Sequence, residues 1–324
     1  MEEFIMKRDL KKIISQMTLE EKAGMCSGLD FWHLKSVERL GIPEVMVSDG
    51  PHGLRKQDDK GDHLGMNDSI KAVCFPPAAL SACSFDRSLM EAMGETIGRE
   101  AQANDVSVVL GPAVNIKRSP LCGRNFEYYS EDPLLAGMMA AAMTLGVQKV
   151  PGCGTTIKHF ACNNQEDNRM GSDSILSERA LREIYLKGFE IAAKDAQPMS
   201  IMTSYNLING VHAANCYDTC TKAARDEWGF AGAIMTDWTT TNVQIQGECT
   251  AAGCMRAGND MVMPGLPEDH ENIKKELADG TLTMAELKRC IYNTVNIVLQ
   301  SNMYEGAVSY LDQFDDLDTY LVVK

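Results

Sequence analysis

Polar side chains stand where several apolar, β-prone runs of this sequence end, and their types could support nucleophilic and acid–base chemistry. In the clearest case, the segment 231–238 leads from an apolar run into Asp237 and Trp238. A carboxylate at the mouth of a buried strand is costly to keep, so a chain that retains one generally uses it. Taken alone, Asp237 is better explained as the N-cap of a following helix, because Asp favours that position. The other strand ends decide between the two interpretations.

Each of those other ends also carries groups that donate or accept hydrogen bonds. Together they supply carboxylate, guanidinium, ammonium, imidazole, phenol and indole groups, from Asp49, Arg124, Lys158, His159, Tyr205 and Trp238. This mixture suits a polyhydroxylated ligand, because it pairs vicinal hydroxyls with donors and acceptors and offers an aromatic surface to an apolar ring face. Each residue also has a purely structural explanation, such as a turn at Asp49, an ion pair of Arg124 with Glu127 or Glu131, and core packing of His159 and Tyr205. Their joint occurrence at five strand ends favours a binding site.

The elements that position these residues alternate between strands and helices. Strands are predicted at Val45–Ser48, Val106–Leu110, Thr155–His159, Ser200–Tyr205, Ala233–Asp237 and Asp260–Met263. Helices are predicted at Arg87–Asn104, Pro133–Gln148, Ser177–Ala196, Asp218–Trp228, Gln244–Ala257, Pro267–Ala278 and Met284–Gln300. The alternation predicts an α/β fold with a parallel sheet buried on both faces, of the TIM-like (β/α)8 barrel type with irregular first strands. The rival, a doubly wound sheet, lacks the glycine-rich fingerprint after its first strand.

Segments near the two ends of the chain differ from the barrel pattern. Thr18 and Glu21 form a predicted capping box that begins a short helix ending near Gly28. Residues 304–324 are acidic and weakly periodic, so we predict a barrel over residues 1–303 and an acidic linker or arm over 304–324. The polar segment Lys56–Asn67 is predicted to be a mobile surface loop.

Composition limits the class of protein and of partner. The 324 residues are 44% hydrophobic and 23% charged, which is typical of a globular protein. A net charge of −14 argues against a nucleic-acid partner, and no apolar run approaches the roughly 18 residues of a membrane span. The charged N-terminus lacks the apolar core of a signal peptide, so a cytoplasmic location is expected.

The 11 cysteines are expected to be reduced thiols rather than disulfides or metal ligands. The spacings Cys216/Cys220 and Cys249/Cys254 loosely resemble metal half-sites. No clustered histidine or second tight pair completes either one, so no metal or other cofactor is expected.

Several motifs resemble those of glycoside hydrolase family 3, in the order of that family and over about residues 15–300. They are Asn115–Pro120, Gly123–Glu127, Lys158–Glu166, Ser177–Glu183 and Ala257–Pro264. The resemblance is to the β-glucosidase and β-xylosidase branch. The N-acetylglucosaminidase branch carries a His/Asp loop after its Lys-His pair, and Asn163–Asn168 does not supply one.

This resemblance implies a retaining mechanism on β-linked sugars, with a β-linked oligosaccharide or an aryl or alkyl β-glycoside as substrate. By position, Asp237 corresponds to the nucleophile that forms a covalent glycosyl-enzyme. Asp49, Arg124, Lys158 and His159 match residues that hold the sugar hydroxyls, Tyr205 matches the phenol beside the nucleophile, and Trp238 matches the aromatic wall. Lys158, Arg124 and local hydrogen bonds are expected to keep Asp237 ionised.

The sequence also departs from the family pattern. The acid/base glutamate of the β-glucosidase branch comes from an α/β sandwich domain, and these 324 residues do not contain one. Glu127, Glu131 and Glu166 fall at motif positions of scaffold or rim residues, and Thr239–Thr241 stand where the family often has glycine or another small residue. We therefore expect that the chain either acts with a separate α/β sandwich domain or associates with a second copy of itself.

Two alternative functions remain open. One is a catalytically idle sugar-binding barrel or domain fragment, motivated by the missing acid. The other, a phosphate-handling lyase or isomerase, is disfavoured because no glycine-rich phosphate loop lies near the last strands.

Overall fold

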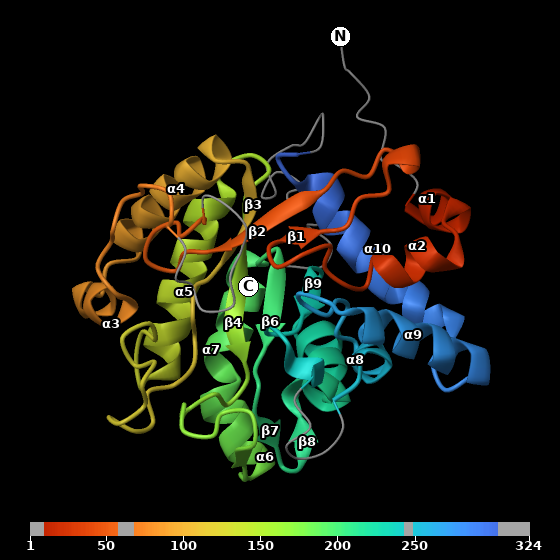
Figure 1. Ribbon diagram of the computed structural model, residues 1–324. Helices are drawn as coiled ribbons and strands as arrows, with labels where there is room; N and C mark the ends of the chain where they lie inside the picture. The colour runs from red at the N-terminus through yellow and green to blue at the C-terminus, as the bar shows by residue number, and fades with distance from the viewer. Residues whose placement is uncertain (1–9, 58–67, 243–248, 304–324) are drawn as a thin grey trace.

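A curled six-stranded sheet lies at the centre of the computed structural model, which describes residues 10–57, 68–242 and 249–303 (Figure 1). The strand order is β1-β2-β3-β4-β6-β9, and all neighbours are parallel except the antiparallel pair β1 and β2. The strands are His33–Leu34 (β1), Val45–Asp49 (β2), Val106–Leu110 (β3), Gly154–Phe160 (β4), Ser200–Thr203 (β6) and Ala233–Met235 (β9). Parallel strands that follow one another in the chain require crossover connections, which the predicted helices supply. The predicted barrel-type α/β fold with irregular first strands is confirmed.

Single backbone bridges, rather than further strands, connect the two outer strands β1 and β9. Within the described part of the chain these bridges join Met235 with Met261, Val262 with Ser27, and Gly28 with Leu34. The prediction of a strand over Asp260–Met263 is therefore wrong. The Asp260 carboxylate accepts the Ile234 amide at 2.8 Å, which takes a donor that a strand partner's carbonyl would otherwise use. Pro264, which has no amide hydrogen, then ends the segment.

A second, three-stranded sheet lies away from the central one. It consists of Asp173–Ser174 (β5), Leu207–Ile208 (β7) and Val211–His212 (β8), with β5 and β7 parallel and β7 and β8 antiparallel. The alternation pattern did not predict it, because two-residue strands are too short to show a period.

Helices flank the central sheet, with α4, α5 and α7 towards the left of Figure 1 and α8, α9 and α10 towards the right. Their bounds are Leu10–Gln16 (α1), Leu19–Gly24 (α2), Ala78–Ser81 (α3), Arg87–Ala103 (α4), Pro133–Gln148 (α5), Glu178–Ala180 (α6), Lys187–Ala196 (α7), Ala251–Ala257 (α8), Pro267–Asp279 (α9) and Met284–Gln300 (α10). Local caps explain several starts. Thr18 and Glu21 form the predicted capping box of α2, Asp86 caps α4, and Asp132 caps α5 ahead of Pro133.

Three predicted helices differ in detail from those observed. The predicted helix Ser177–Ala196 is divided by a π-helical turn at Leu181–Tyr185. The predicted helix Asp218–Trp228 is π-helical over Asp218–Glu227. In the described part of the predicted helix Gln244–Ala257, α8 begins only after Thr250, whose side chain accepts the Gly253 amide. Hydrophobic spacing indicates that a segment is helical but cannot distinguish α from π hydrogen bonding.

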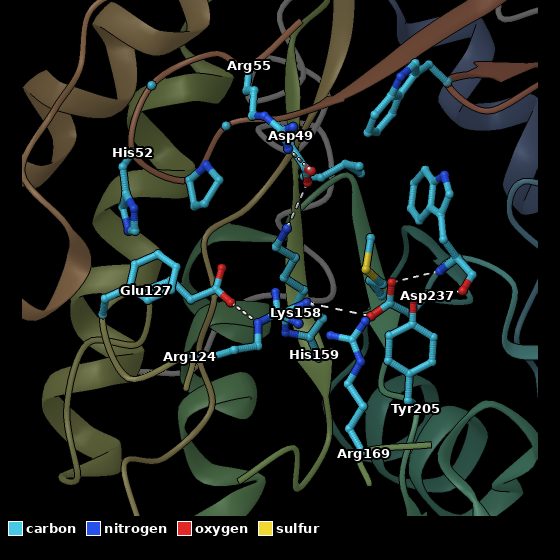
Figure 2. Close-up of a pocket in the computed structure, with 18 of the residues that line it drawn as sticks. Asp49, His52, Arg55, Arg124, Glu127, Lys158, His159, Arg169, Tyr205 and Asp237 are labelled. Carbon is cyan, nitrogen blue, oxygen red and sulfur yellow. Dashed lines mark hydrogen bonds and ion pairs between the residues drawn. The ribbon is translucent and has the colours of Figure 1, made fainter. Parts of the chain in front are cut away.

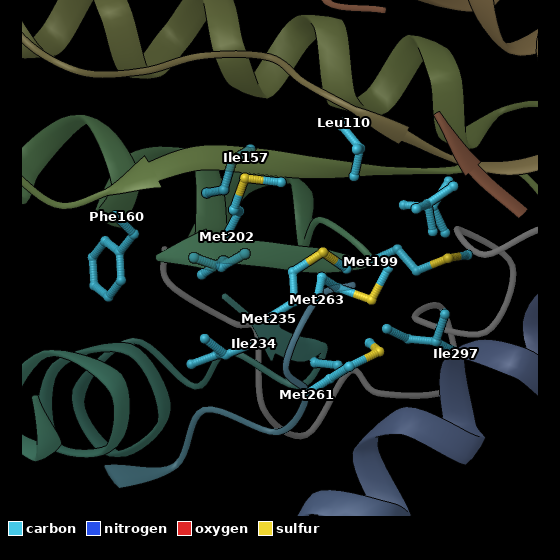
Figure 3. Packing of buried hydrophobic residues seen from close by; sticks show 14 of the residues in the cluster. Leu110, Ile157, Phe160, Met199, Met202, Ile234, Met235, Met261, Met263 and Ile297 are labelled. Carbon is cyan, nitrogen blue, oxygen red and sulfur yellow. The ribbon is translucent and has the colours of Figure 1, made fainter. Parts of the chain in front are cut away.

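Methionine side chains gather among the central strands β4, β6 and β9 (Figure 3). Met199, Met202, Met235, Met261 and Met263 are all buried, beside Ile157 and Phe160 of β4. Unbranched, flexible side chains can fill the irregular interior of a curled sheet.

Some predictions fall on residues that the structure does not describe. The acidic arm at 304–324 and most of the predicted mobile loop Lys56–Asn67 lie outside the described residues. Among the helices that are described, none is both long and apolar enough to cross a membrane.

Candidate active site

All seven residues predicted for the site line one cavity of about 500 Å³ at the carboxyl ends of the central strands (Figure 2). Asp49 is the last residue of β2, Lys158 and His159 lie near the end of β4, and Asp237 follows β9. Arg124, Tyr205 and Trp238 complete the predicted set. The carboxyl ends of parallel strands meet at one edge of a sheet, which explains why residues almost 190 positions apart converge.

Asp237 is held by its immediate neighbours and is 8% exposed. One carboxylate oxygen accepts the Trp238 amide at 2.7 Å, and the Tyr205 hydroxyl beside it donates to the Trp238 carbonyl at 2.8 Å. Burial raises the pKa of the Asp237 carboxyl above its ordinary value, and Arg124, the Trp238 amide, Lys158 and Tyr205 only partly oppose this. Arg124, Lys158 and these hydrogen bonds favour the ionised carboxylate, as expected from the sequence, while burial makes Asp237 a stronger base than an exposed aspartate.

His159 stands next to Asp237 but is not its counter-ion. The distance from His159 Nε2 to the Asp237 carboxylate is 3.8 Å. Burial lowers the pKa of His159 well below its usual value, and Arg124, Lys158 and Arg169 lower it further. The imidazole is thus neutral and serves as a hydrogen-bonding group. The Asn115 side chain fixes the main chain of His159, because it accepts the His159 amide and donates to the His159 carbonyl, both at 2.7 Å.

Two carboxylates on the other walls of the cavity are already paired with cations. Asp49 accepts a hydrogen bond from the nearly buried Lys158 ammonium at 3.1 Å, with Arg55 3.7 Å away. Glu127 pairs with Arg124, which is one of the two pairings that the sequence allowed. These pairs present donors and acceptors side by side, which is the pattern that vicinal hydroxyls require.

Arg169 belongs to the site and was missed from sequence. It lines the cavity, its guanidinium lies 4.6 Å from the Tyr205 ring centroid, and it donates to Glu166 at 2.8 Å. Asn163 holds the same Glu166 at 3.2 Å. Glu166 is therefore a residue that orients Arg169, as a scaffold position would, and Glu131 is exposed. The available signal was the spacing of three residues between Glu166 and Arg169, which permits a local ion pair.

Other residues missed from sequence form an aromatic wall beside Asp237. Phe31 and Trp32, from the segment before β1, line the cavity together with Trp238. The Trp238 indole donates to the Phe31 carbonyl at 2.8 Å. Their sequence signal was two adjacent aromatic residues, but nothing local indicated that they face a strand end about 200 residues away.

His52 and Phe126 also line the cavity, with their ring centroids 6.1 Å apart. The His52 Nε2 accepts the Ala78 amide at 2.9 Å, and burial lowers the pKa of this imidazole. His52 is therefore a neutral residue whose proton resides on Nδ1.

The cysteines do not form a metal site within the part of the chain that the structure describes. All 11 are free thiols, and no group of three or more potential metal ligands occurs among the described residues. Cys249 and Cys254 both lie against the Asn215 side-chain oxygen, at 3.5 and 3.1 Å.

The arrangement as a whole suits a neutral, polyhydroxylated ring. A basic carboxylate faces the cavity at Asp237, charged pairs supply donors and acceptors, and aromatic rings stand on one side. A carboxylate in this position can attack an electrophilic carbon of a ligand that the other groups hold in place.

We expect the Asp237→Asn variant to be more stable than the wild type. Because the folded-state pKa of Asp237 is raised, the carboxyl contributes stability that is present at low pH and lost as pH rises through that pKa. A neutral amide can still accept the Trp238 amide, so a gain of about 0.5–2 kcal/mol at neutral pH is expected. Urea unfolding measures it. The gain must shrink as the pH is lowered, and a gain independent of pH would contradict this account.

Sequence comparison with known proteins gives a consistent result. A model of the Glycosyl hydrolase family 3 N terminal domain matches residues 14–296. Thermostable beta-glucosidase B of Acetivibrio thermocellus is 47% identical over 296 residues, which cover 90% of this chain and 38% of that protein. Exo-alpha-(1->6)-L-arabinopyranosidase of Bifidobacterium longum is 44% identical over 308 residues, or 95% of this chain and 39% of that protein.

Solved structures agree with the sequence comparison. Beta-glucosidase 3B of Thermotoga neapolitana, in complex with alpha-D-glucose, superposes with a TM-score of 0.83 at 37% identity, covering 95% of this chain and 45% of that one. The GH3 beta-glucosidase of Bifidobacterium adolescentis gives a TM-score of 0.81 at 42% identity, covering 94% and 43%. This chain therefore spans less than half the length of these relatives.

Proposed function

The chain belongs to glycosyl hydrolase family 3, and from this premise we propose that it is the barrel of a retaining β-glycosidase with Asp237 as its nucleophile. The observation that carries the proposal is the setting of Asp237. It is a buried, basic carboxylate at a strand end, beside Tyr205 and Trp238, in a cavity lined by sugar-compatible donors and acceptors. Attack of this carboxylate on the anomeric carbon would displace the leaving group and form a glycosyl ester.

The hydroxyl-binding groups are proposed to be Asp49, Arg124, Lys158 and His159, to which we add Arg169. The paired charges Asp49–Lys158 and Glu127–Arg124 offer acceptor and donor atoms at adjacent positions. The neutral His159 can donate to or accept from a hydroxyl without adding charge. Binding energy from several hydroxyls would orient the anomeric carbon towards Asp237.

The proton donor is proposed to lie in a second domain outside these 324 residues. Retaining hydrolysis needs a second carboxyl about 5–5.5 Å from the nucleophile. Among the described residues that line the cavity, the carboxylates other than Asp237 are Asp49 and Glu127, and each is engaged with a cation. The relatives that this chain matches are more than twice as long, which leaves room for such a domain in a complete enzyme.

The sugar is proposed to be a β-D-glucoside or a related β-glycoside. The relatives named above include both a beta-glucosidase and an arabinopyranosidase. A β-D-glucoside and an α-L-arabinopyranoside both present an equatorial anomeric bond, so one placement of the nucleophile can serve either ring. Assays should therefore include glucosides, xylosides and arabinopyranosides.

A second candidate function is a sugar-binding barrel that does no chemistry, favoured because Asp49 and Glu127 are both engaged with cations. Leaving-group ability separates the two functions. We expect this chain to release dinitrophenolate from a dinitrophenyl β-D-glucoside, because that leaving group needs no proton, and to leave cellobiose uncleaved. General acid catalysis contributes about 10²–10⁴-fold, so a difference of at least that size is expected.

The measurement is absorbance for the aryl glucoside and glucose release for cellobiose, with Asp237→Asn as the background control. Binding of glucose without turnover of either substrate would instead favour the idle barrel. Cleavage of cellobiose at a rate near that of the aryl glucoside would show that the proton donor is in this chain.

A further inference from the structure

A buried carboxamide holds one of the aromatic side chains of the cavity. Gln57 is 3% exposed, and its side-chain oxygen accepts a hydrogen bond from the Trp32 indole at 2.9 Å. Trp32 lines the cavity, whereas Gln57 is not among the described residues that do so. Gln57 can therefore influence a bound ligand through the indole rather than by touching it.

The backbone around Trp32 is fixed by other contacts. One Asp30 carboxylate oxygen accepts the amides of Trp32 and His33 at 2.8 and 2.9 Å. The Trp32 carbonyl accepts the Val47 amide at 2.8 Å, which ties the segment to β2. Because these bonds set the position of the main chain, the hydrogen bond to Gln57 principally sets the orientation of the ring.

The Trp32 ring belongs to a cluster of three rings next to Asp237. Its centroid lies 5.7 Å from that of Trp238 and 4.7 Å from that of Phe31, the latter in an edge-to-face arrangement. Trp238 directly follows Asp237 in the chain. Rotation of the Trp32 indole would therefore change the shape of the wall nearest the candidate nucleophile.

We propose that Gln57 is a positioning residue that fixes the Trp32 indole as a platform for the leaving group. The proposal rests on the proposed function, in which Asp237 attacks the anomeric carbon. The leaving group is bonded to that same carbon, on the face opposite the attacking Asp237 oxygen, so it lies at the end of the sugar that meets the Phe31, Trp32 and Trp238 rings. The ligand class is a leaving group with a flat or apolar face, such as an aryl group or the C–H face of a second sugar.

The experiment compares two ligands that need no turnover, glucose and phenyl 1-thio-β-D-glucopyranoside, by calorimetry on the intact chain. Gln57→Met removes the acceptor at similar side-chain length, which leaves a buried indole N–H without that partner. Affinity for the thioglycoside should fall about tenfold, while affinity for glucose stays within about twofold. Gln57→Glu keeps an oxygen at the same reach and should restore most of the loss.

Two controls separate positioning from general damage. Gln300→Met alters another buried glutamine, on α10 and outside the cavity lining, and should change neither affinity. In a Trp32→Phe background, which has no indole donor, Gln57→Met should add no further loss. Equal loss of affinity for both ligands, or no loss for either, would overturn the proposal.

The failure of the proposed function has a different signature. If the wild-type chain binds neither glucose nor the thioglycoside, the proposal that this cavity binds a sugar is wrong. The positioning role is then decided by near-ultraviolet circular dichroism, which reports the fixed Trp32–Trp238 pair. That signal should diminish in Gln57→Met and persist in Gln57→Glu, and an unchanged spectrum in Gln57→Met overturns the role of Gln57.

Discussion

Asp237→Asn should abolish covalent labelling of this chain by a 2-deoxy-2-fluoroglucoside that carries a dinitrophenolate or fluoride leaving group. The wild type should gain the mass of one fluoroglucosyl unit, because attack by Asp237 needs no proton donor when the leaving group is activated. An amide cannot serve as the nucleophile, so the labelling rate should fall by at least about 10⁴-fold. Intact-protein mass spectrometry measures the rate, and peptide mapping should place the label on Asp237.

A matched control is available in Asp195→Asn, which alters an exposed carboxylate on α7 and should label like the wild type. The pH dependence supplies a second check. Because burial raises the pKa of Asp237, labelling should decline with falling pH at a value above 3.8, the ordinary pKa of aspartate. Labelling of Asp237→Asn at the wild-type rate would show that another residue is the nucleophile.

Asp260→Ala should lower the free energy of unfolding by about 3–5 kcal/mol. Asp260 is fully buried, and its carboxylate accepts the Ile234 amide at 2.8 Å and the Asn293 side chain at 3.0 Å. It also pairs with Arg225, whose side chain is only 13% exposed. Truncation to alanine would leave that guanidinium without its counter-ion in a dry environment. Urea unfolding followed by circular dichroism measures the loss.

Asp226→Ala, which removes an exposed carboxylate next to Arg225 in the chain, should lie within about 0.5 kcal/mol of the wild type. Addition of Arg225→Met to Asp260→Ala should recover part of the loss, because the unpaired charge is then removed as well. A loss of stability in Asp260→Ala no larger than in Asp226→Ala would contradict the role of the pair. So would the absence of any recovery in the double variant.

The Asp260 segment illustrates where sequence patterns fail. Its apolar residues Met261–Met263 have the composition of a buried strand, which predicts a strand over this segment. In the folded chain the segment forms only isolated bridges, while Asp260 engages Arg225 and Ile234. Periodicity reports burial, but hydrogen-bond pairing depends on a partner segment that the local sequence does not specify.

The predicted site residues were found together because they share one local feature. Asp49, Lys158, His159 and Asp237 each lie at or just after the end of an apolar parallel strand. The rule that parallel strand ends meet at one edge converts that local feature into a spatial prediction. Arg169, Phe31 and Trp32 lie in irregular segments, so no such rule placed them.

The sequence by itself determined the α/β class, the family resemblance and the candidate nucleophile, because each depends on patterns within short segments. Only the tertiary structure decided how the cavity is completed. It tied Trp32 to Gln57, set the Phe31 carbonyl against Trp238, and placed Arg169 over Tyr205. It also showed that the pKa of Asp237 is raised, because the pKa of a carboxyl follows its burial as well as its charged neighbours. Burial results from packing the whole chain, so no local stretch of residues could have revealed it.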